Sequence, residues 1–218
     1  MRKILILSLS VMLSFIATAQ EEITEGVLIA KQTMSSDNEQ MNAQLKAMGD
    51  SQAITYFKGD KSRSETSNPM SGDMVIVVDG AEKQMLMLFD QPGVGKKYML
   101  QSFVPSEEDL KSVTVEKGDE TKTVMGYECQ QYFVKMKQNG QDVEMQMFTT
   151  DKISAFSHNT TAMGGEVEGY PLYFVMTLNQ MGSNIIVTSE ITEIKQESVS
   201  DDKLSLTPPE GFSKMEGM

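Results

Sequence analysis

The chain has 218 residues, 39% of them hydrophobic, and 31 acidic against 19 basic side chains give a formal charge of −12 at pH 7. This acidity argues against a nucleic-acid partner, because phosphate recognition needs a basic face. The only cysteine is Cys129, which excludes an internal disulfide, so the fold must depend on a buried core.

The N-terminus has the pattern of a cleaved export signal. Two basic residues precede an apolar run over residues 4–16, and an Ala-Thr-Ala cleavage motif ends at residue 19. The run is shorter than the ~20 residues of a membrane-spanning helix, and no cysteine stands near the cut to carry a lipid. We therefore expect residues 1–19 to be removed. Residues 20–218 should then form one exported β domain, periplasmic or extracellular, with neither a transmembrane segment nor a lipid anchor.

Short runs of alternating or wholly apolar residues recur along the rest of the chain, separated by Gly, Asp and Asn turn signals. Their close spacing favours antiparallel neighbours, since parallel strands need long crossover connections. The pattern predicts a mainly β (α+β) fold, a large curved antiparallel sheet or incomplete barrel of about eleven strands with one or two covering helices. The predicted strands span residues 23–33, 52–59, 61–67, 73–79, 84–90, 95–101, 112–117, 127–138, 141–149, 170–180 and 184–195.

A helix is expected between the first two strands. The segment Ser36-Asp37-Asn38-Glu39 has the spacing of a capping box that starts at Ser36, and Gly49 supplies a stop. The apolar face of this helix consists of Met41, Leu45 and Met48. A second helical turn is expected at residues 106–111, and the glycine-rich stretch 157–169 is expected to be a long mobile loop.

The segment 122–148 contains a predicted β-hairpin. Asn139-Gly140 favours a type I′ turn, because both residues tolerate positive φ. The resulting register puts apolar side chains on one face and opposite charges on the other, so a slip of one residue would place methionines among charges. The predicted apolar pairs are Met136 with Val143, Val134 with Met145 and Tyr132 with Met147; the charged pairs are Lys137 with Asp142 and Lys135 with Glu144.

Methionines spaced two apart, Met85 with Met87 and Met145 with Met147, allow two interpretations. A strand points alternate side chains the same way, so the thioethers could hold copper(I), a soft ion. The same spacing follows from any strand with one apolar face, where methionine fills an irregular core or groove. The second interpretation is favoured because the chain has no His- or Cys-rich cluster, and we expect no metal site and no cofactor.

No catalytic constellation is evident, and we expect that the protein is not an enzyme. A nucleophilic Cys129 would need a base, and the only histidine, His158, lies some thirty residues further on. A partly buried structural Cys129 is the simpler interpretation.

The stretches "MVIVVDGAEKQMLMLFD…KKYM", "TKTVMGYECQQYFVK", "GYPLYFVMT" and "LTPPEGFSKM" resemble a domain-of-unknown-function family of secreted envelope proteins. That family is similar to the LolA/LppX-like lipoprotein carriers. The resemblance implies an incomplete antiparallel barrel whose concave face receives acyl chains, with helices over the opening. Carriers of this kind hold the lid with an arginine, and Arg63 is the only arginine that follows residue 19.

Pattern and resemblance together predict a non-enzymatic periplasmic protein that binds a lipid, an acyl chain or another apolar ligand on the concave face of the sheet. The alternatives are an envelope interaction or structural protein with a filled core and, less favoured, a methionine-based copper(I) protein. Arg63 is a candidate lid or polar contact. The candidate groove residues are Met41, Leu45, Met48, Met85, Met87, Val134, Met136, Met145, Met147, Phe174 and Met176.

Overall fold

A single twelve-stranded sheet dominates the computed structural model, which describes residues 21–68, 72–138, 140–180 and 182–215. The strand order is β12-β6-β5-β4-β3-β2-β1-β11-β10-β9-β8-β7, and every neighbouring pair is antiparallel except β12 with β6. The strands are β1 (Glu25–Ser36), β2 (Ser51–Lys58), β3 (Lys61–Asn68), β4 (Gly72–Asp79), β5 (Gln84–Gln91), β6 (Gly95–Ser102), β7 (Thr114–Val124), β8 (Tyr127–Gln138), β9 (Gln141–Thr150), β10 (Tyr170–Gln180), β11 (Ser183–Lys195) and β12 (Ser213–Lys214).

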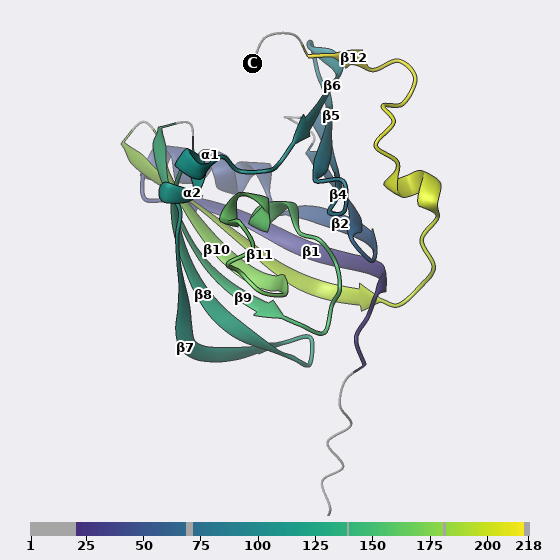
Figure 1. Cartoon of the computed structure of the whole chain (residues 1–218). Helices are drawn as coiled ribbons and strands as arrows, with labels where there is room; N and C mark the ends of the chain where they lie inside the picture. The colour runs from purple at the N-terminus through teal and green to yellow at the C-terminus, as the bar shows by residue number, and fades with distance from the viewer. Residues whose placement is uncertain (1–20, 69–71, 139, 181, 216–218) are drawn as a thin grey trace, which may run out of the picture.

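The short helical elements lie in the connections. They are α1 (Glu39–Met48), α2 (Glu107–Lys111) and two 3-10 turns, η1 (His158–Met163) and η2 (Asp201–Leu204). The sheet is strongly curved: β1 and β7–β11 form a trough, and β4–β6 rise from it as a separate arm (Figure 1). We call β4–β6 the upper arm. Register shifts interrupt β1, β7 and β10, and such bulges increase local bend and twist.

The predicted fold class is confirmed, and the eleven predicted strands correspond to β1–β11. Ten of them agree within three residues at each end, whereas β7 continues seven residues beyond its predicted end at residue 117. The hairpin register is also confirmed: Val134 pairs with Met145 and Met136 with Val143. On its other face Lys135 and Glu144 approach to 3.5 Å. Asn139 and the signal segment lie outside the described residues. No helix among the described residues is long and apolar enough to span a membrane.

Two further details differ from the prediction. Ser36 does not cap α1, because it continues β1; the cap is Asn38, whose Oδ1 accepts a hydrogen bond from the Met41 N–H at 3.0 Å. The predicted stop at Gly49 is confirmed, with a φ of 73°. The second difference is β12, a two-residue parallel strand beside β6 that has no hydrophobic pattern to reveal it.

Each face of the sheet is covered by a different irregular segment. Residues 151–169, which we call the strap, cover the inner, concave face over β8–β10, where Met163 and Val167 pack among the methionines of β9. Residues 196–214, the C-terminal tail, cover the outer face. Val199 and Leu204 of the tail pack with Val27, and its Leu206 and Phe212 pack on the upper arm.

Candidate functional site

A cavity of about 560 Å³ lies where the strap meets the base of the upper arm. Five segments form it: the chain just before β1, the β2–β3 turn, the β4–β5 turn, the connection from β6 to α2, and the strap itself. Its apolar lining consists of Phe103, Val104, Pro105, Ile153, Ala155, Phe156 and Val167. Serine and threonine side chains and the backbone of several glycines supply the polar part of the lining.

A buried carboxylate shapes the turn at the base of the upper arm. Asp79 Oδ1 accepts hydrogen bonds from the N–H groups of Ala81 at 3.1 Å and Glu82 at 3.0 Å. Its Oδ2 lies 2.9 Å from Lys61 Nζ, and the side chain is only 3% exposed. Burial opposes ionisation of Asp79, but Lys61 and the two N–H groups outweigh it, so the pKa of Asp79 lies below its ordinary value. The Gly80 N–H then donates to Asp60 O at 2.8 Å, which joins this turn to the β2–β3 turn.

Phe156 fastens the strap to the upper arm. Its ring centroid lies 5.3 Å from that of Phe103, and its carbonyl accepts a hydrogen bond of 2.6 Å from Ser62 Oγ. The ring also packs over Gly80, where a Cβ would come within 2.7 Å of it. The position therefore needs glycine for close approach rather than for backbone conformation.

The far end of the strap is tied to β9. Thr149 Oγ1 donates to Glu168 O at 2.6 Å, and Gly169, with a φ of 79°, lies against the Thr150 carbonyl, where no Cβ would fit. Between the two anchors, Val167 lines the cavity and also packs in the methionine cluster with Met163. The strap is thus the wall that separates the cavity from that cluster.

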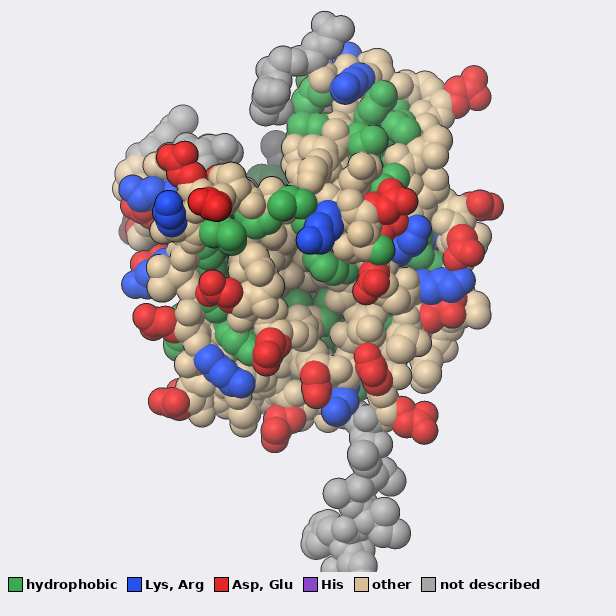
Figure 2. Space-filling model, in the orientation of Figure 1, with side chains coloured by type: hydrophobic (Ala, Val, Ile, Leu, Met, Phe, Trp, Pro, Cys, Tyr) green, Lys and Arg blue, Asp and Glu red, His purple; other side chains and the backbone are tan. Residues whose placement is uncertain are grey.

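The charged side chains at the cavity are exposed and stand at its rim: Glu22, Asp60, Lys83 and Asp151. The lining mixes apolar side chains with hydroxyl groups and glycine backbone, and the charged side chains stand at the rim, which suits a ligand that combines an apolar part with a few polar groups. Acidic side chains are spread over the face of the molecule that Figure 2 shows.

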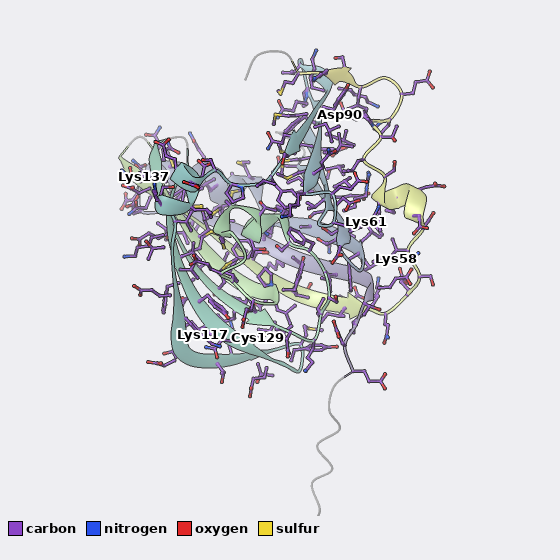
Figure 3. All side chains as sticks on the ribbon, in the orientation of Figure 1. Lys58, Lys61, Asp90, Lys117, Cys129 and Lys137 are labelled. Atoms are coloured by element: carbon purple, nitrogen blue, oxygen red, sulfur yellow. The ribbon has the colours of Figure 1, made fainter. Side chains whose placement is uncertain are left out.

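The thiol and the imidazole lie on different elements, and burial disfavours the charged form of each. Burial raises the pKa of Cys129 to about 11, and its Sγ–H donates to Tyr127 O at 3.5 Å within an apolar cluster low in the trough (Figure 3). Burial lowers the pKa of His158, the first residue of η1, to about 4, so it is neutral at pH 7. The described residues hold no group of three or more His, Cys, Asp or Glu side chains placed to bind a metal.

The predicted groove residues fall into three places. Six lie together on the inner face of β8–β10, where Met163 and Val167 fill the space over them: Val134, Met136, Met145, Met147, Phe174 and Met176. Met41, Leu45 and Met48 are half-buried on α1, which packs against β1, and they belong to none of the buried clusters. Met85 and Met87 lie on the upper arm.

Arg63 faces the other side of the sheet. It pairs across β3 and β4 with Val77, whose side chain packs on the C-terminal tail, and its Nε lies 2.6 Å from Glu65 Oε1. The cavity itself was not predicted, because the turns and the strap that build it have no hydrophobic period. The glycines of residues 157–169 were the only local signal.

The sequence matches the family described as "Domain of unknown function (DUF4412)" over residues 38–212. The chain belongs to this family. Among solved structures, one titled "Structure of PNGF-II in C2 space group" aligns with 87% of this DUF4412 chain at 13% identity and a TM-score of 0.49. The alignment spans 31% of that longer chain. No curated protein matches the sequence.

Proposed function

We propose that this DUF4412 protein is an exported, non-enzymatic binding protein that takes a lipid, an acyl chain or another apolar ligand into the cavity between the strap and the upper arm. The cavity is the observation that carries the proposal. Its volume of about 560 Å³ is typical of small-molecule sites, which combine apolar walls with a few polar groups.

The resemblance to the LolA/LppX-like carriers supports the same ligand class, since those proteins use the concave face of a curved sheet. Here the inner face of β8–β10 is apolar, and the cavity lies on the other side of the strap from it. The methionine cluster of β8–β10 is filled by Met163 and Val167, so we place the ligand in the cavity instead of over that cluster. Burial of Met145 and Met147 likewise leaves their sulfur atoms away from solvent and disfavours copper(I) binding.

The test is displacement of a fluorescent fatty acid from delipidated protein, using two valines of similar exposure. Val104 lines the cavity and is 58% exposed, and Val94, in the β5–β6 turn, is 56% exposed and does not line it. We expect Val104→Trp to narrow the cavity and weaken binding by roughly tenfold, about 1.4 kcal/mol, and Val94→Trp to bind as the parent chain does.

Equal affinities for the two variants would place the ligand elsewhere. No binding by the parent chain would reject the proposal and favour the alternative of an interaction or structural protein with a filled core. Melting temperatures of both variants, measured alongside, control for unfolding.

A further inference from the structure

Strands β4 and β5 are apolar on both faces, as their sequences MVIVV and MLMLF show. Strands of this composition are usually buried on both sides. The C-terminal tail covers only the outer face, where Leu206 and Phe212 pack against Val77, Leu86 and Leu88. On the inner face of the upper arm, Val78 and Ile76 near the base are buried, at 1% and 9% exposed, while residues nearer the tip are more exposed.

The register defines this inner face. Val78 pairs with Met85, Ile76 with Met87 and Met74 with Phe89, and Met87 also pairs with Met99 of β6. Met74 is 39% exposed, and Met85, Met87, Phe89 and Met99 are half-buried. By contrast, Met145 and Met147 of the other methionine cluster are 6% and 0% exposed. The chain therefore has two methionine-rich inner surfaces, one closed and one that is partly open toward the tip of the arm.

The partly open surface continues from the cavity. Gly80, Lys83 and Phe103 line the cavity at the ends of β4, β5 and β6. The next inner-face residues along the first two of these strands are Val78 and Met85. From Val78 and Met85 the apolar side chains continue toward the tip of the arm. In Figure 3 the label Asp90 lies at the tip and the label Lys61 lies at the base. The four steps along the strand from Val78 to Met74 extend about 13 Å.

We infer that the apolar chain of the ligand leaves the cavity at the base of the upper arm and lies along this inner face, over Met85, Met87 and Met99. The inference rests on the proposed function and specifies the path of the ligand within it. Half-exposed, flexible methionines adapt to chains of different shape, which suits a surface that is covered only when a ligand is bound. Hydroxyl side chains of β3, Ser62, Ser64 and Thr66, pair with the β4 residues and border the path on one side.

The experiment uses the chain from Gln20 with isotope-labelled methionine methyl groups followed by NMR. The probe is stearic acid that carries a nitroxide either near its methyl end or near its carboxylate. With the nitroxide at the methyl end, we expect the methyl signals of Met74, Met87 and Met99 to broaden, and those of Met145, Met147 and Met163 to stay sharp. The carboxylate-labelled probe should broaden the methyl signals of the upper arm less.

Broadening centred on Met145, Met147 and Met163 would overturn the inference, because the chain would then lie behind the strap. Binding that broadens no methionine signal would also overturn it, since no methionine lines the cavity. Failure of the fatty acid to bind at all would reject the proposed function itself.

A pair of variants gives an independent readout by fatty-acid displacement. We expect Met87→Gln to weaken binding of stearic acid by roughly tenfold while changing binding of a short-chain acid little. The matched control is Met125→Gln, at a residue that is 47% exposed in the β7–β8 turn and away from the upper arm. If Met87→Gln weakened the binding of short and long acids equally, or of neither, the proposed path along the inner face would be contradicted. Met99→Gln repeats the test if Met87→Gln fails to fold.

Discussion

Asp79 offers the sharpest test of how the base of the upper arm is built. Replacement by alanine removes two hydrogen bonds from the turn, to the N–H groups of Ala81 and Glu82, and the pair with Lys61. Each turn bond contributes about 1 kcal/mol. Lys61 is half-exposed and becomes hydrated when its partner is removed, so loss of the ion pair lowers the free energy of unfolding by at most about 1 kcal/mol. We therefore expect Asp79→Ala to lower the free energy of unfolding by about 2–3 kcal/mol at pH 7.

The loss should depend on pH with a defined sign. The pKa of folded Asp79 lies below the ordinary 3.8, so the ionised carboxylate stabilises the fold above that value. This stabilisation is lost as the pH falls through the lowered pKa. The difference between the parent chain and Asp79→Ala should accordingly be largest near neutral pH and shrink below pH 3.8.

Urea unfolding followed by circular dichroism at several pH values measures the effect. Asp79→Asn keeps an acceptor for the turn and should lose less stability than Asp79→Ala. The control Asp142→Ala, at a side chain that is 77% exposed and pairs loosely with Lys137 at 3.8 Å, should change little. A loss for Asp79→Ala that is the same at pH 7 and pH 3, or no larger than that of the control, would refute the reasoning.

Three further predictions follow from burial and position. Leu204→Ala, in the C-terminal tail, should lower the free energy of unfolding by about 2–4 kcal/mol in a urea titration, whereas Leu110→Ala, at a half-exposed side chain, should lower it little. An equal loss of unfolding free energy in the two variants would show that the tail does not cover the outer face. Cys129→Ala should leave ligand binding intact, and the parent thiol, with its pKa raised to about 11, should react with a thiol reagent at pH 8 only after unfolding; rapid labelling of the folded chain would contradict this. Arg63→Ala should leave fatty-acid affinity unchanged in the displacement assay, because the side chain lies on the outer face, and a large loss would instead support a lid role.

Much of the sheet could be predicted because its strands are joined by short turns. Each turn fixes the register of a local pair, as Gly140 and the charge pairs on either side of it do for β8 and β9. The pairing of β1 with β11 joins distant parts of the chain, so no turn encodes it. The cap of α1 was misplaced by two residues, because Ser36 and Asn38 are both good caps and only pairing with Ile185 shows that Ser36 belongs to β1.

The site was harder to predict than the sheet. The apolar pattern identified methionine-rich faces but could not show which of them another segment covers, since the strap and the tail reach their positions through side chains such as Phe156 and Leu204. The alternation of apolar and polar residues along the strands predicts an apolar face for both Met85 and Met147 and does not distinguish them. Only the structure shows that Met147 is closed in and that Met85 is half-exposed.

Native mass spectrometry of the protein purified without detergent from its own envelope tests the central claim most directly. The account predicts a bound apolar molecule that leaves on mild activation and that is reduced in Val104→Trp but retained in Val94→Trp. A bare chain, together with no uptake of added fatty acid by the delipidated protein, would contradict it.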